Sequence, residues 1–78
     1  MRVRLAQRIV ADSEIAFEKP TIEGTRVPVE MLIGKMAGGM SAETVADEYG
    51  VERADVLAAL EYASHLISRK RVRRADSR

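Results

Sequence analysis

The chain has 78 residues, of which 46% are hydrophobic, with one Phe, two Tyr, no Trp and no Cys. A chain of this length forms one domain and buries only about 60 to 65% of its unfolded surface, so we expect a thin aliphatic core and at least a dimer. Without cysteine there is no disulfide framework and no thiolate site, and no segment has the apolar length of a signal peptide or a membrane span. These properties favour a soluble, cytoplasmic protein that is not a membrane protein.

Charge is distributed unevenly along the chain. Residues 69–78 carry six basic residues and one acidic residue, a net charge of +5, whereas residues 1–68 carry −4. An acidic body with a basic end indicates a partner that offers phosphates or carboxylates. We therefore expect a folded domain at residues 1–67 and a basic, flexible tail at residues 68–78.

The first predicted elements are short strands. Residues 8–17, RIVADSEIAF, hold two apolar patches on either side of a polar Asp-Ser-Glu turn. Two proline-bearing arms follow, at residues 19–22 and 26–29, and flank a corner in which Gly24 can take a positive φ and reverse the chain. Because proline lacks a backbone donor, each arm is expected to be an edge strand or part of a single-sided ribbon.

Three helices are predicted after this corner. Apolar residues at spacings of three and four indicate the first helix, with Pro28 in its first turn and Gly38-Gly39 at its end: Val29, Leu32, Ile33, Met36 and Ala37. Ser41 is the expected N-cap of a second helix that ends at Tyr49. The third helix starts near Glu52, where Asp55 can accept first-turn N–H bonds, and has the apolar stripe Val56, Leu60, Ala63 and Ile67.

The junction between the second and third helices has the spacing of a helix-turn-helix. Ala46 is a small residue where two helices approach, Gly50 serves the turn, and Val51 and Val56 lock the third helix onto the second. A recognition helix usually offers cationic or amide side chains to DNA, and here Arg53 is outnumbered by Glu52, Asp55 and Glu61. The third helix can therefore read DNA through Arg53 or pack against a protein, and the sequence leaves both open.

The run from residue 9 to residue 63 resembles a small prokaryotic family of unknown function, number 433, whose antitoxin-like members are often encoded beside a PIN-like ribonuclease toxin. The resemblance rests on Lys-Pro-x-Ile-x-Gly-Thr-Arg-Val-x-Val at residues 19–29, Gly39-x-Ser41, and DVLAALEYA at residues 55–63. Two departures are Glu18, where the family commonly has glycine, and Tyr49-Gly50, where it often has Tyr-Pro.

The resemblance implies a mainly α fold, with a short N-terminal β-ribbon followed by a three-helix homeodomain-like bundle. It also implies a homodimer formed through the N-terminal strands, repression of the protein's own promoter by binding double-stranded DNA, and neutralisation of a PIN-like toxin. Within this frame the corner residues Gly24, Thr25 and Arg26 are expected to hold the ribbon rigidly against the bundle, with Arg26 paired to Glu30 or to a carboxylate on another helix. Phosphate binding by the corner is the alternative.

The basic tail has two candidate roles. An Arg-rich segment can occupy the carboxylate cluster with which a PIN-like nuclease holds its metal ions, which makes these residues toxin-binding candidates: Arg69, Lys70, Arg71, Arg73 and Arg74. The same segment can contact DNA phosphates, so the DNA-binding candidates are Arg53, Arg69, Lys70 and Arg71. A solvated tail with neither role is the third possibility.

Enzyme chemistry is not expected, and neither is a cofactor or a metal. His65 is the only histidine, and no nucleotide-binding loop occurs. Three functions remain: an antitoxin that binds both toxin and promoter DNA, a stand-alone DNA-binding regulator, and a homo-oligomeric adaptor.

Overall fold

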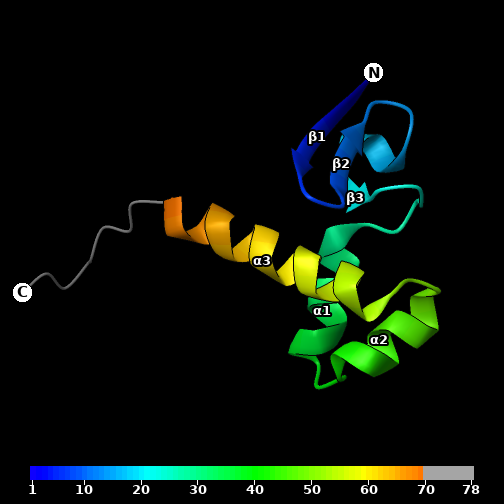
Figure 1. Cartoon of the computed structure of the whole chain (residues 1–78), viewed down its shortest axis with the longest axis vertical. Coiled ribbons are helices and arrows are strands. Elements are labelled where there is room, and N and C mark those ends of the chain that lie inside the picture. Colours follow the sequence, from blue (N-terminus) through cyan, green and yellow to red (C-terminus); the bar gives the residue numbers. More distant parts are fainter. Residues whose placement is uncertain (70–78) are drawn as a thin grey trace, which may run out of the picture.

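The computed structural model describes residues 1–69, which form a three-stranded antiparallel sheet followed by three helices (Figure 1). The elements are β1 (Arg2–Ala6), β2 (Ile9–Asp12), the short 3₁₀ turn η1 (Ala16–Glu18), β3 (Pro20–Ile22), α1 (Val29–Ala37), α2 (Ala42–Tyr49) and α3 (Arg53–Arg69). The expected N-terminal β structure with three helices after it is therefore confirmed, whereas the homeodomain-like arrangement stays a prediction.

The sheet has the order β1-β2-β3, so β3 is an edge strand, as its proline requires. The strand β1 lies before the first predicted strand, and its sequence RVRLA alternates charged and apolar residues with the period of two that a strand shows. It pairs with β2 from Arg2↔Asp12 to Ala6↔Ile9, and the register shifts between Arg4 and Ala6. Leu5 lies in this irregularity.

Two of the predicted strand segments are wrong. The second proline arm forms no strand, because Pro28 has no N–H and Val29 already begins α1; only an isolated bridge joins Thr21 to Pro28. The patch at Ile15 and Phe17 is no strand either. It forms a tight turn at η1 because β3 must run back antiparallel to β2.

The helix ends follow the predicted signals closely. Pro28 stands immediately before α1 with an extended backbone, so it precedes the first turn instead of lying in it. The Ser41 hydroxyl caps α2 by accepting the Thr44 N–H at 3.1 Å. Gly50 ends α2 at φ 68°, and its N–H bonds to the Ala46 carbonyl.

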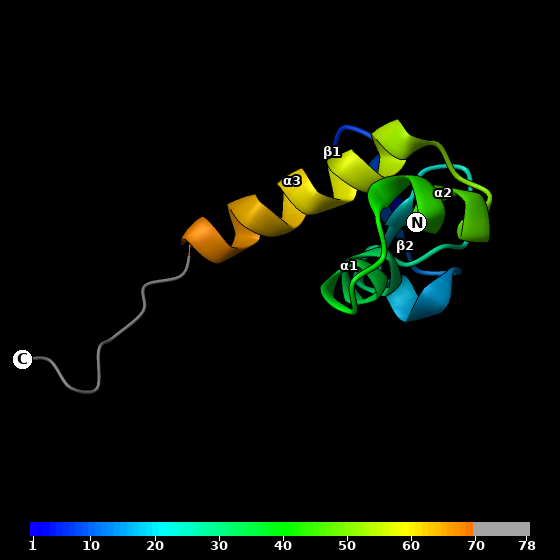
Figure 2. The ribbon, with the colours of Figure 1, turned by 90° about the horizontal axis from the view of Figure 1, so that it is seen from below.

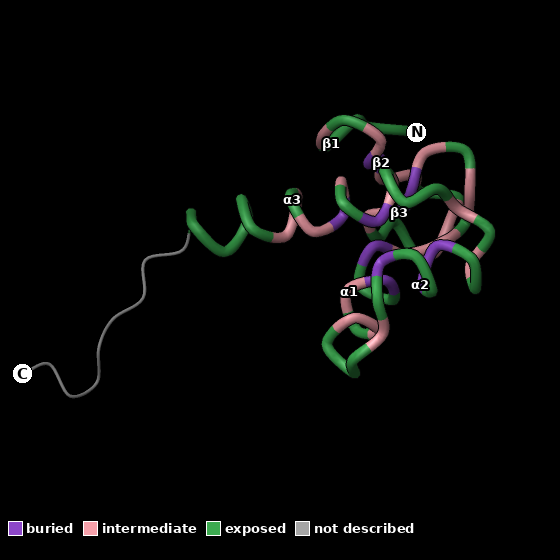
Figure 3. The backbone as a smooth tube through the Cα atoms, turned by 60° about the horizontal axis from the view of Figure 1, so that its bottom comes forward, coloured by how far each residue is buried: buried purple, intermediate pink, exposed green. Residues whose placement is uncertain are grey.

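The core is aliphatic and lies where α3 crosses between the sheet and the pair α1 and α2 (Figures 1 and 2). Its buried members come from every helix and from two strands: Ile9, Ile22, Val29, Leu32, Ala42, Val45, Ala46, Val56 and Ala59. Because α3 then continues past the body, its outer half is exposed (Figure 3). The predicted apolar stripe is therefore wrong at Ile67, which is 70% exposed.

Candidate functional site

The DNA-binding candidate Arg53 lies in the first turn of α3 and is held by α2. Its Nε donates to Glu43 Oε2 at 2.6 Å. The hydrogen bond that the Glu43 carboxylate accepts from its own backbone N–H, together with that of Arg53, lowers the pKa of Glu43. Arg53 is thus engaged in an ion pair between two helices, while 58% of its side chain stays exposed to solvent.

The start of α3 is fastened to the sheet by a cluster in which the cap by Asp55 is as predicted and the contact with Arg8 is not predicted by the sequence. Asp55 accepts the N–H of Glu52 at 2.9 Å, which caps the helix from within its first turn. The other oxygen of Asp55 accepts from Arg8 in the β1-β2 turn at 2.8 Å, and Glu52 accepts from the same guanidinium at 3.4 Å. The bond to Asp55, followed by that to Glu52, raises the pKa of Arg8 above its ordinary value. An arginine in a polar turn carries no sequence signal for such a contact.

The predicted corner is closed by Thr25. Its hydroxyl donates to the Ile22 carbonyl at 2.8 Å and accepts the Val27 N–H at 3.0 Å, while Gly24 has φ 83°. The expected pairing of Arg26 with Glu30 is wrong, because Glu30 binds Lys19 at 2.9 Å. Arg26 is exposed, forms no ion pair within residues 1–69, and lines a separate hollow over Val10.

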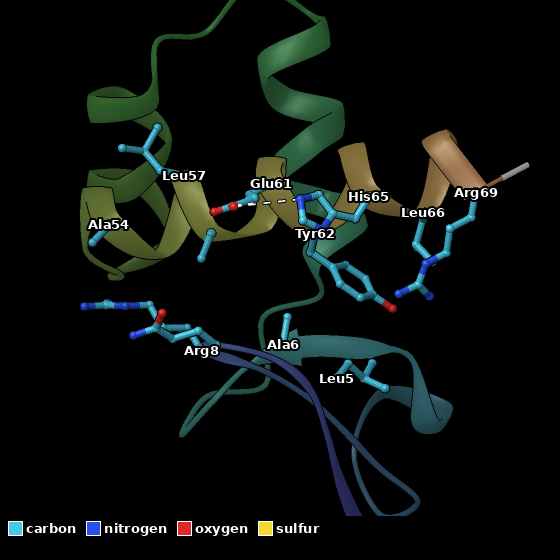
Figure 4. A pocket seen from close by; sticks show the side chains of 12 residues that line it. Leu5, Ala6, Arg8, Ala54, Leu57, Glu61, Tyr62, His65, Leu66 and Arg69 are labelled. Carbon is cyan, nitrogen blue, oxygen red and sulfur yellow. Dashed lines mark ion pairs between the residues drawn. The ribbon is translucent and has the colours of Figure 1, made fainter.

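An apolar groove of about 410 Å³ runs between the β1-β2 turn and the outer face of α3 (Figure 4). Its walls include Leu5 and Ala6 on one side, and on the other the α3 residues Leu57, Ala58, Tyr62 and Leu66. Polar side chains also line the groove, among them Arg8, Glu61, His65 and Arg69, and Glu61 Oε2 lies 3.8 Å from His65 Nε2. Leu57 and Leu66 remain 41% and 44% exposed, so nothing in residues 1–69 fills the groove.

The described end of α3 contributes one basic residue to the groove. Arg69, the last described residue, lines the groove and is exposed. The helix thus runs through Arg69, past the expected boundary of the domain at residue 67. The other basic candidates, Lys70, Arg71, Arg73 and Arg74, lie outside the described residues.

Neither a metal site nor a membrane span is found in residues 1–69. These residues contain no group of three or more His, Cys, Asp or Glu side chains placed to hold a metal ion. None of the helices in this part of the chain combines the length and the apolar character that crossing a membrane requires.

Comparison with known proteins places the chain in a family. No curated protein matches the chain. The crystal structure of Rv2018 from Mycobacterium tuberculosis is similar, with a TM-score of 0.69 and 30% sequence identity over 76% of this chain. The match covers 29% of the Rv2018 chain, so this protein spans less than a third of that length. Residues 9–63 match the family described as Protein of unknown function (DUF433), and the chain belongs to that family.

Proposed function

We propose that this protein is an antitoxin-like partner of a PIN-like ribonuclease, which it binds and neutralises through the outer half of α3 and the basic residues that follow. The observation that carries the proposal is the exposed apolar end of α3. Leu66 is 44% exposed and Ile67 70% exposed, directly before Arg69 and five further basic residues. Aliphatic side chains followed by clustered arginines suit a partner that presents an apolar surface beside carboxylates.

The electrostatics of the chain support this assignment. PIN-like nucleases hold their metal ions with carboxylates, and guanidinium groups pair with carboxylates through two parallel hydrogen bonds. Residues 69–78 carry a net charge of +5, so they can compete with metal ions for that cluster. Burying Leu66 and Ile67 against the partner would add about 1.5–3 kcal/mol for each side chain fully removed from water.

Co-expression with the product of the adjacent gene tests the proposal. We expect the ribonuclease to co-purify with the full chain and to be lost from a chain that ends at Ser68. A second variant, Leu66→Ser with Ile67→Ser, keeps every basic residue and should weaken capture, whereas Met31→Ser on α1 should not. Failure of the full chain to capture or inhibit the ribonuclease would overturn the proposal.

Binding of the promoter is the second half of the proposed function, and the α2-Gly50-α3 corner favours it. The Val51 N–H bonds to the Ala46 carbonyl at 3.0 Å, and Ala46 is buried, which gives the close approach that a helix-turn-helix needs. Since Arg53 is bound to Glu43, the cations that meet phosphates would come mainly from the basic end of the chain. Duplex titrations at several salt concentrations should then show a salt slope that falls by about 0.9 for each phosphate that the chain ending at Ser68 no longer neutralises.

A further inference from the structure

Residues 13–18, which make up all but the last residue of the connection between β2 and β3, carry the most unusual backbone in the described part of the chain. Ala16, Phe17 and Glu18 have φ values of 51°, 55° and 64°, so three successive residues with side chains lie in the left-handed region that favours glycine. Such strain persists only where the surrounding structure enforces it, and it gathers at functional positions. We call residues 13–18 the Phe17 loop.

The Phe17 loop is fastened by hydrogen bonds on both sides of its tip. The Glu14 N–H donates to Asp12 Oδ1 at 2.8 Å, the Glu18 N–H to the Ile15 carbonyl at 2.9 Å, and the Lys19 N–H to the Ala16 carbonyl at 3.1 Å. The N-terminal amine also donates to Ser13 Oγ at 2.7 Å. The loop therefore has a defined shape, and it presents Phe17, the only phenylalanine, at 95% exposure.

Two glutamates flank Phe17 in the sequence of the loop. Glu14 and Glu18 are exposed, and neither forms an ion pair with any residue of the described range 1–69. The nearest cation along the chain, Lys19, is bound to Glu30 in the first turn of α1 at 2.9 Å. The loop thus offers one aromatic ring between two carboxylates that form no ion pair within residues 1–69, and the N-terminal amine on Ser13 is the cation that its hydrogen bonds hold.

This combination has the chemistry of a single-stranded nucleic acid, in which a flat ring lies between negative groups. Proteins that bind single-stranded RNA combine a cationic groove with surfaces on which bases stack. We propose that the Phe17 loop occupies the RNA-binding groove of the ribonuclease partner, with Phe17 in the place of a base and Glu14 and Glu18 in the place of phosphates. The inference rests on the proposed function, because only a partner that binds RNA must carry such a groove.

The Phe17 loop lies on the opposite side of the molecule from the end of α3 (Figures 1 and 2). The two elements also carry opposite charges, acidic in the loop and basic after Ser68. They consequently suit two different surfaces, the loop a cationic RNA groove and the basic end a carboxylate cluster. The loop can be altered without touching the surface on which the proposed function depends.

The test measures the affinity of the full chain for the ribonuclease, with and without a competing short single-stranded RNA, in the absence of divalent metal so that the RNA is not cut. We expect Phe17→Ala to weaken binding at least about tenfold, as removal of an exposed aromatic anchor does. Glu14→Gln with Glu18→Gln should weaken binding several-fold and reduce its salt dependence. The RNA should compete with the wild-type chain and much less with the Phe17→Ala variant.

Matched controls are Met31→Ala, an exposed apolar residue on α1, and Asp47→Asn, an exposed carboxylate on α2, which should both bind like wild type. If the ribonuclease is captured but all three loop substitutions leave affinity and RNA competition unchanged, the inference is wrong and the proposed function stands. If the wild-type chain captures no ribonuclease, the proposed function is wrong, and the inference that rests on it is wrong as well. If Phe17→Ala instead changes the sedimentation of the chain alone, Phe17 contacts a second copy, and the inference is overturned.

Discussion

At the scale of single residues, Glu18 shows how a family pattern and a backbone conformation meet. The resemblance leads one to expect glycine before Lys19-Pro20, and the structure gives Glu18 the φ of 64° that glycine adopts freely. The chain therefore keeps the turn and accepts the strain of a β-carbon in it.

The first prediction follows from this strain. Glu18→Gly should raise the free energy of unfolding by about 1 kcal/mol, because relief of the left-handed conformation outweighs the added freedom of the unfolded chain. For a domain of this size the melting temperature should rise by about 4–8 °C. Glu14→Gly is the control, since Glu14 is not among the residues with positive φ, and it should lower stability. Equal effects of the two substitutions would contradict the argument.

A second prediction at this scale concerns pH. Hydrogen bonding from Arg4, at 2.8 Å, lowers the pKa of Glu23 below 4.5, and the pKa of Glu43 is lowered as well. A carboxylate with a depressed pKa in the folded state contributes stability above its unfolded pKa and loses that contribution as the pH falls through its folded value. Stability should therefore decline between about pH 5 and pH 3.

Urea titrations at several pH values check this dependence. The double variant Glu23→Gln with Glu43→Gln should show a flatter decline than wild type over the same range. A decline of equal steepness in both proteins would show that other carboxylates determine the acid sensitivity.

At the scale of elements, the start of α3 depends on one carboxylate. Asp55 caps the Glu52 N–H and binds Arg8, so it joins helix initiation to the position of the β1-β2 turn. Asp55→Ala should lower the free energy of unfolding by about 1–2 kcal/mol through loss of the cap alone.

Asp55→Asn is the informative comparison for this prediction. It keeps an oxygen for the helix cap but loses the charge that binds Arg8, so its stability should lie between those of wild type and Asp55→Ala. Chemical denaturation of both variants, combined with Arg8→Gln in a double-mutant cycle, measures the coupling. Zero coupling between Asp55 and Arg8 would mean that their ion pair does not stabilise the fold.

The elements also show what the sequence predicts and what it does not. Gly38, Ser41 and Gly50 locate the helix ends because each acts on its own neighbours through a local hydrogen bond or a positive φ. Local rules fail at the Phe17 loop, where residues other than glycine take left-handed conformations that only the pairing of β2 with β3 imposes.

The candidate site also has one part that the sequence predicts and one part that it does not. The basic end is visible from composition, whereas the groove arises only when Leu5 and Leu66, 61 positions apart in the sequence, face one another across it. Proximity in sequence suggests Glu30 as the partner of Arg26, but Lys19 approaches Glu30 through the fold. The periodicity of a sequence does not predict contacts between segments that are far apart in the chain.

At the scale of the whole molecule, the sheet is open at β1. No strand within residues 1–69 pairs with the outer edge of β1, and Val3 is 45% exposed. An unpaired strand edge with apolar side chains favours association with a second copy, in line with the homodimer that the family resemblance implies.

The fourth prediction tests that dimer. Val3→Lys should shift sedimentation equilibrium toward the monomer, because a lysine on the edge disfavours pairing between strands. Met31→Lys on α1 replaces a residue of nearly equal exposure, 44%, and should leave the association constant unchanged. If wild type and both variants are equally monomeric at all concentrations, the edge is not a dimer interface.

Under the proposed function, the exposed outer half of α3 would give the protein a means of setting affinity without altering the residues that touch the partner. Helical segments of fewer than about 12–15 residues are marginal in water, so the turns beyond Ala63 are expected to exchange between helix and coil while Val56 and Ala59 stay protected. A partner that recognises the helical form then binds in proportion to the fraction of molecules that are helical. Ser64→Ala, which raises helix propensity at an exposed position, should slow amide exchange near the end of α3 and tighten binding. The helix–coil equilibrium at the end of α3 would thus set the fraction of molecules that are able to bind the partner.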